Sequence, residues 1–141
     1  MSAIFHSVGG VLTVPESQID AVTAVSGSGP AYFFLMVEAM VDAGVDAGLP
    51  RAVATDLVVQ TMAGSAAMLL EGLDKAAPAN DGAMGATMDT SPAQLRATVT
   101  SPGGTTAAGL RELERGGVRA AVANAVAAAK IRSEQLGITS E

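Results

Sequence analysis

Residues 30–47 read PAYFFLMVEAMVDAGVDA and have the pattern of a helix that is strongly apolar in its first half. Pro30 suits the first turn of a helix, where its missing N–H breaks no hydrogen bond, and Gly48 suits the helix end. Residues 32–37 are apolar on every side, so we expect this helix to be buried centrally. The fully apolar run of residues 31–37 is too short to cross a bilayer.

Helical spacing of apolar residues recurs along the rest of the chain. Further helices are expected over residues 15–25, 50–70, 92–99 and 117–136. One more helix is expected to begin at residues 100–106 and to end at Gly116. Gly64 is expected to mark a close helix crossing, and Met62 and Met68 are interpreted as core filler rather than a cofactor pocket. The predicted fold class is all-α, a bundle of five or six helices.

Residues 8–15, VGGVLTVP, read as a turn followed by one short strand, because β-branched residues precede Pro15. A lone strand cannot satisfy its own backbone donors and acceptors. Either this strand pairs with another chain, or its sheet lies outside this sequence. Later in the chain, residues 73–89 lose the helical periodicity, are small and polar, and are interpreted as a surface loop that is expected to be mobile.

The composition excludes several classes of function. The chain has 141 residues, 49% of them apolar, which is enough for one domain with a core. Its net charge of -6 argues against a nucleic-acid partner, because phosphate binding needs basic patches. Cysteine is absent and His6 is the single histidine, so no thiolate or histidine metal site is expected. The first residues lack a secretory signal, so a cytoplasmic protein that does not enter membranes is expected.

An acidic stripe and a glycine-rich segment could each suggest a binding site, but each has a simpler structural explanation. Glu38, Asp42 and Asp46 form an acidic stripe, and a solvated face or pairing with arginine is favoured over a metal or catalytic role. The glycines of residues 27–29 resemble part of a dinucleotide fingerprint, but Tyr32 stands where its third glycine belongs and no βαβ unit surrounds them. A tight turn between two helices explains these glycines without a ligand.

Residues 100–106, TSPGGTT, combine glycines with the start of a helix. Glycines let a ligand approach the backbone, and the first turn of a helix offers unpaired N–H groups at the positive end of its dipole. Ser101, Thr105 and Thr106 add hydroxyl donors. These residues fit a small anion such as a carboxylate, and they fit a simple Ser/Thr capping motif equally well.

Two stretches resemble the motifs of the pyrroline-5-carboxylate reductases. Residues 20–32, DAVTAVSGSGPAY, are similar to one motif, and residues 98–110, TVTSPGGTTAAGL, resemble the family's most specific one. Residues 48–51 and 114–121 also match in order and spacing, so the resemblance covers nearly the whole chain. Two departures stand out: the loop of residues 73–89 is longer than usual, and the family's N-terminal Rossmann domain is absent.

The resemblance implies a reductase that converts 1-pyrroline-5-carboxylate to proline with NADPH or NADH and forms interlocked homodimers, sometimes decamers. Residues 1–15 would be the remnant of the nucleotide-binding domain and residues 16–141 the helical dimerisation and substrate-binding domain. The substrate would be held by Ser101, Gly103, Gly104, Thr105 and Thr106, with Thr106 as the catalytic hydroxyl beside the imine nitrogen. The nicotinamide side would be formed by Ser26, Gly27, Ser28, Gly29 and Pro30.

Alone, this chain is expected to be inactive and to bind no cofactor tightly, because it carries no dinucleotide fingerprint. Two alternatives remain. One is a module whose present function is dimerisation only. The other is the helical half of another β-hydroxyacid-dehydrogenase-like enzyme, which would require a catalytic lysine in a helix; Lys75 and Lys130 are poorly placed for that role.

Overall fold

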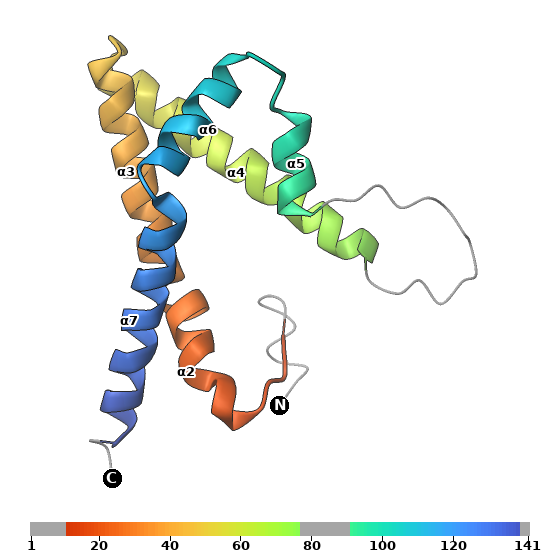
Figure 1. Cartoon of the computed structure of the whole chain (residues 1–141), viewed down its shortest axis with the longest axis vertical. Coiled ribbons are helices and arrows are strands. Elements are labelled where there is room, and N and C mark those ends of the chain that lie inside the picture. The colour runs from red at the N-terminus through yellow and green to blue at the C-terminus, as the bar shows by residue number, and fades with distance from the viewer. Residues whose placement is uncertain (1–10, 77–90, 139–141) are drawn as a thin grey trace, which may run out of the picture. The chain divides into compact units, whose positions relative to one another are not determined.

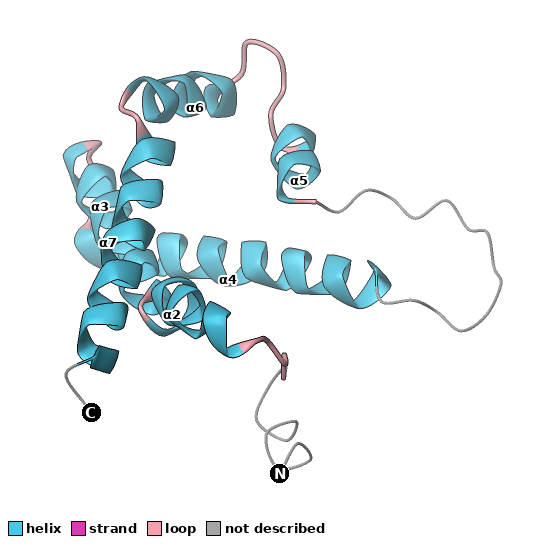
Figure 2. Cartoon of the chain, turned by 60° about the horizontal axis from the view of Figure 1, so that its bottom comes forward, coloured by secondary structure: helices cyan, strands magenta, loops and turns pink. Residues whose placement is uncertain are grey.

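The computed structural model describes residues 11–76 and 91–138, and every regular element within these ranges is helical (Figures 1 and 2). The all-α prediction is therefore confirmed. The predicted strand is wrong where it can be compared, because residues 11–15 form no regular structure, and residues 8–10 lie outside the described ranges. The physical reason is the absence, in the described ranges, of a second strand with which it could pair.

The chain divides into two compact units, of which the first comprises residues 1–32 and 119–141. Its described part starts with a nearly continuous helical stretch: η1 (Glu16–Gln18), α2 (Ile19–Val22) and the π-helical η2 (Thr23–Gly27). The N–H of Ser28 donates to the Thr23 carbonyl at 2.9 Å, a bond across five residues that closes the π turn. The expected break at residues 26–30 is therefore a single bend at Ser28, after which α3 (Gly29–Asp46) begins.

Polar contacts join this stretch to α7 (Val118–Ile138), whose greater part belongs to the same unit. The Ser133 hydroxyl donates to Asp20 Oδ1 at 2.6 Å, and the Lys130 ammonium bonds to the Glu134 carboxylate one turn along the helix. That bond to Glu134, with a smaller contribution from the charge of Asp20, raises the pKa of Lys130. The Ser133–Asp20 hydrogen bond joins α7 to the start of α2, whereas the Lys130–Glu134 pair lies within α7.

The second unit, residues 33–118, contains most of α3 with α4 (Arg51–Ala76), α5 (Pro92–Thr98) and α6 (Thr105–Arg115). Gly48 ends α3 in the left-handed region at φ 101°, and the Leu49 N–H returns to the Gly44 carbonyl at 3.0 Å. A Cβ on Gly44 would lie 3.2 Å from the Ala54 Cβ, so the close crossing of α3 and α4 is here. A Cβ built on Gly64 would have nothing within 4 Å. The close helix crossing predicted at Gly64 is therefore wrong for the described part of the chain.

The second unit also tests the expectations for the acidic stripe of α3 and for the end of α4. Asp42 Oδ1 lies 2.8 Å from Arg51 Nη2 with both side chains more than half exposed, which confirms an arginine partner for one member of the acidic stripe. Helix α4 runs on to Ala76, so the loop predicted from residue 73 begins too early; residues 77–90 lie outside the described ranges. The residues that extend α4, Glu71 to Ala76, are mostly good helix formers, and their intrinsic propensity sustains the helix where the apolar periodicity has ended.

The apolar side chains in the first half of α3 are largely exposed to solvent. Phe33, Phe34 and Leu35 are 63%, 67% and 65% exposed, so the expectation of a centrally buried helix is wrong for a single chain. Among the described residues, the buried apolar side chains are Ala24, Val41 and Ala54, none of them large. By length and hydropathy, residues 16–46 and 51–73 also meet the criterion for a membrane span, which the core helix of a soluble protein meets as well. Exposed apolar surface of this extent is typical of a face that packs against another protein surface.

Candidate functional site

The segment that enters α6 is a tight turn. The Gly104 N–H donates to the Ser101 carbonyl at 3.0 Å, with Pro102 second in the turn and Gly103 third at φ 70°. A proline followed by a residue with positive φ is the pattern of a type II turn, in which the third position favours glycine. The sequence thus dictates how the chain reverses before α6.

Helix α6 begins without a side-chain cap. Gly104 is its N-cap residue, at φ -77° and ψ 174°, and its carbonyl accepts the first helical bond from the Ala108 N–H at 3.1 Å. The three amides that follow, those of Thr105, Thr106 and Ala107, have no acceptor within the described part of the chain. The capping interpretation of this motif is therefore wrong, and the amides at the positive end of α6 are free for an anion.

Ser101 lies directly over this helix start. A Cβ on Gly104 would be 2.5 Å from the Ser101 Oγ and 3.2 Å from its carbonyl oxygen, so a side chain at position 104 would displace the hydroxyl. Ser101, Thr105 and Thr106 are all exposed, while Gly104 is half-buried. The hydroxyls and the free amides thus form an open, solvent-exposed surface. A ligand bound there would be enclosed only if another protein segment packed over it.

The threonines around this turn fall into two groups. The Thr98 hydroxyl donates to the Gln94 carbonyl at 2.9 Å, and the Thr100 hydroxyl donates to the Arg96 carbonyl at 2.6 Å. The hydroxyls of Thr105 and Thr106 make no hydrogen bond to any described residue. The first pair therefore supports the structure of α5, and the second pair remains available to a ligand.

The other predicted site segment is helical and belongs to the first unit, whereas residues 101–106 belong to the second. Ser26 and Gly27 complete η2, Ser28 is the bend, and Gly29 and Pro30 open α3. Gly29 is buried and Ser28 half-buried; Ser26, Gly27 and Pro30 are exposed. Because the helical residues of α2 and η2 directly precede the glycines, this segment lacks the strand-to-helix turn of a dinucleotide-binding site, in agreement with the sequence argument.

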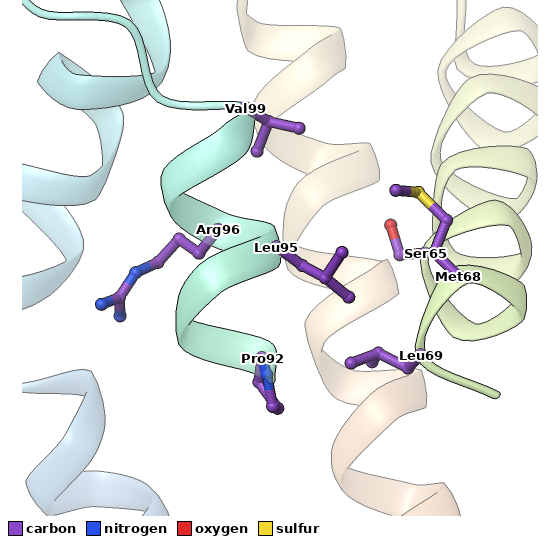
Figure 3. Close-up of a pocket in the computed structure, with 7 residues that line it drawn as sticks. All are labelled: Ser65, Met68, Leu69, Pro92, Leu95, Arg96 and Val99. Carbon is purple, nitrogen blue, oxygen red and sulfur yellow. The ribbon is translucent and has the colours of Figure 1, made fainter. Parts of the chain in front are cut away.

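Two apolar grooves, which the sequence analysis missed, lie in the second unit. One, of about 300 Å³, lies between α4 and α5 and is lined by Ser65, Met68, Leu69, Pro92, Leu95, Arg96 and Val99. Figure 3 shows Leu95 and Met68 facing each other while the Arg96 side chain points away. Met68 is 49% exposed, so it lines a groove instead of filling a core. The four-residue spacing of Leu95 and Val99 was the available signal for this face.

The second groove, of about 220 Å³, runs between α3 and α4 and is lined mainly by Phe33, Met36, Val37, Met40, Val58 and Met62. Neither groove includes any residue of the turn that opens α6. Both have the chemistry of a surface that packs against protein, because apolar side chains predominate and few polar groups converge. Within the described ranges, no three acidic or histidine side chains gather in a way that could hold a metal ion.

Comparison with known proteins gives consistent matches. Residues 16–136 match the family model "Pyrroline-5-carboxylate reductase dimerisation". The chain is 72% identical over 140 residues to a pyrroline-5-carboxylate reductase of Mycobacterium leprae, covering 99% of the chain and 48% of that relative. The corresponding enzyme of Synechocystis is 50% identical over 96% of the chain and 45% of the relative. The chain thus spans about half the length of the curated relatives it matches, their carboxy-terminal half.

Solved structures of pyrroline carboxylate reductases have the same fold as this chain. The pyrroline-5-carboxylate reductase of Coxiella burnetii superposes with a TM-score of 0.78 at 38% identity, covering 95% of this chain and 44% of that one. The pyrroline carboxylate reductase of Plasmodium falciparum, solved with NADP bound, gives 0.75 at 37% identity over 96% of this chain and 48% of that one.

Proposed function

The chain belongs to the pyrroline-5-carboxylate reductase dimerisation family, and from this we propose that it is the helical half of an enzyme that reduces 1-pyrroline-5-carboxylate to L-proline with NADPH or NADH. In that proposal, residues 16–141 form the dimerisation and substrate-binding domain, and residues 1–15 are the end of a nucleotide-binding domain. We place the enzyme in the cytoplasm.

The observation that carries the proposal is the helix start at α6. The amides of Thr105, Thr106 and Ala107 have no acceptor within the described part of the chain, and they point out of the positive end of a helix. A substrate carboxylate placed there would receive charge-assisted hydrogen bonds from these amides, supplemented by the Ser101 hydroxyl. Gly103 keeps the approach to the backbone clear of a side chain, and Gly104 leaves room for the Ser101 hydroxyl over the helix start.

With the carboxylate anchored at this point, the ring nitrogen of the substrate comes within reach of a hydroxyl of the same turn. Reduction of an imine adds a hydride to carbon and a proton to nitrogen. Thr106 is proposed as the hydrogen-bond partner of that nitrogen, because its hydroxyl makes no hydrogen bond to a described residue. Such a donor acts where charge changes during the reaction, which is where a positioned group accelerates it most.

The hydride must come from outside this chain. The described residues contain no strand–turn–helix element that could hold a pyrophosphate, and the segment Ser26, Gly27, Ser28, Gly29, Pro30 is helical around one bend. We propose that this segment faces the nicotinamide in the assembled enzyme and that the chain alone does not bind the nucleotide tightly. The bound NADP of the Plasmodium falciparum relative is consistent with nucleotide use by the complete enzyme.

The same proposal gives the exposed apolar helices a partner, namely a second copy of the chain. The matching family model describes a dimerisation domain, and Phe33, Phe34 and Leu35 are each more than 60% exposed in one copy. Burial of such side chains between subunits is favourable by about 2 kcal/mol each. We propose an interlocked homodimer, with a decamer as the larger assembly to be tested, and no partnership with nucleic acid or membrane.

The test is a fusion of this chain to the amino-terminal half of the Mycobacterium leprae relative, hereafter the fusion protein. We expect it to oxidise NADPH or NADH in the presence of 1-pyrroline-5-carboxylate, and the chain alone to show no such activity. A folded, dimeric fusion protein without substrate-dependent oxidation would refute the proposal and favour the alternative, a module for dimerisation only.

A further inference from the structure

Thr100 stands between the end of α5 and the turn that opens the proposed carboxylate site. Its hydroxyl donates to the Arg96 carbonyl at 2.6 Å, and its N–H donates to the Ala97 carbonyl at 3.1 Å. Thr100 is half-buried, whereas its neighbours Val99 and Ser101 are exposed. Two hydrogen bonds thus hold this one residue against the last turn of α5.

The turn begins at the very next residue. The Ser101 carbonyl accepts the Gly104 N–H at 3.0 Å, and the Ser101 hydroxyl lies against Gly104, where a Cβ would come within 2.5 Å of it. Because Pro102 has a fixed φ and Gly103 is set by the turn, few free dihedrals separate Thr100 from the first amides of α6. The orientation of those amides therefore depends on how firmly Thr100 is held.

We propose that Thr100 is a positioning residue: its hydroxyl fastens the Ser101–Gly104 turn to α5 and so fixes the amides and the Ser101 hydroxyl in the arrangement that receives the substrate carboxylate. This inference rests on the function proposed above for residues 101–106. Thr100 itself does not touch the substrate; it acts through Ser101 and Gly104.

The competing explanation is that Thr100 only satisfies a carbonyl at the end of α5, as hydroxyls near helix ends often do. Thr98 provides a matched control, because its hydroxyl makes the same kind of bond to the Gln94 carbonyl at 2.9 Å in the same helix. Thr98→Val removes a bond that supports α5 alone, and Thr100→Val removes the bond that also holds the turn. Valine has the shape of threonine but cannot donate, and Thr100→Ser retains the hydroxyl.

The first measurement uses the chain as it is. Amide hydrogen exchange of Gly104 reports the bond that closes the turn. We expect exchange at Gly104 to be about fivefold faster in Thr100→Val, the factor that one neutral hydrogen bond represents. Thr98→Val and Thr100→Ser should leave the rate close to that of the parent. Equal acceleration by Thr98→Val, or none by Thr100→Val, would overturn the proposal.

The second measurement uses the fusion protein and separates substrate from nucleotide. Thr100→Val should raise the KM for 1-pyrroline-5-carboxylate about fivefold and leave the KM for the nucleotide unchanged, and Thr100→Ser should restore the parent value. A purely structural loss would change both KM values or the amount of folded enzyme. If the unmutated fusion protein is inactive, the proposed function fails and the substrate role of Thr100 falls with it, while Gly104 exchange still decides whether Thr100 holds the turn.

Discussion

Gly104→Ala perturbs the proposed site by one methyl group. At φ -77° and ψ 174° alanine is sterically acceptable, so the backbone itself is not strained. The new Cβ, however, would lie 2.5 Å from the Ser101 Oγ and 3.2 Å from the Ser101 carbonyl oxygen, and the first of these distances is prohibitive. The Ser101 hydroxyl must rotate into another staggered position, away from the helix start.

The expected magnitudes differ between stability and function. Alanine is a poorer N-cap than glycine by about 1 kcal/mol, and the lower entropy of the unfolded chain returns about 0.4–1 kcal/mol, so melting should change little. Loss of the Ser101 hydroxyl from a bound carboxylate removes a hydrogen bond to a charged group, about 1.5–3 kcal/mol. That corresponds to an increase of about ten- to a hundredfold in the KM for substrate.

The assay is a double-mutant cycle in the fusion protein, with Ser101→Ala, Gly104→Ala and the double variant. Since both changes remove the same hydroxyl from the same place, the KM of the double variant should equal that of either single variant. Thermal unfolding of all four proteins serves as the control for folding. Effects that multiply, or a harmless Gly104→Ala, would refute the idea that Gly104 keeps the Ser101 hydroxyl over the carboxylate.

The remaining predictions concern catalysis, assembly and pH. Thr106→Ala in the fusion protein should lower turnover by about a hundredfold, equivalent to ~3 kcal/mol. The melting temperature should not change, because the Thr106 side chain does not cap α6. A lower melting temperature with normal turnover would show that Thr106 is not part of the site. The chain alone should sediment as a dimer or larger assembly, and a well-folded monomer at micromolar concentration would contradict the interpretation of its exposed apolar helices. Because the Glu134 carboxylate raises the pKa of Lys130 above its unfolded value of about 10.4, the stabilisation is complete below that pH and is lost as pH rises through the folded-state pKa. Urea unfolding of the parent should therefore weaken more at alkaline pH than that of Lys130→Met, and identical pH profiles would count against this contact.

Local signals predicted the helices well, because proline, glycine and serine act on their immediate neighbours. Pro92 does open α5, and Ser91 caps it, accepting the Gln94 N–H at 3.3 Å. The sequence predicts a close helix crossing at Gly64, but the crossing occurs at Gly44 against Ala54. Periodicity identifies the face of a helix but not the residue of another helix that lies opposite, so this error could not be avoided from one sequence.

The candidate site was predicted in part. The residues of the turn and the free amides at the helix start follow from TSPGGTT, but the same residues suit a capping motif, and only the absence of a side-chain bond at Gly104 distinguishes the two. The role of Thr100 depends on a hydroxyl that reaches back four residues to Arg96, which threonine can do in a helix but need not do. The exposure of the apolar residues of α3 depends on a partner, which a single sequence does not contain.

The claim that the start of α6 binds the substrate carboxylate is tested most directly by a crystal structure of the fusion protein with L-proline, the proposed product. We expect the proline carboxylate to lie within hydrogen-bond distance of the Thr105 and Thr106 amides and the Ser101 hydroxyl, and the proline nitrogen to face the Thr106 hydroxyl. Proline bound elsewhere, with the amides of α6 still facing solvent, would contradict the account.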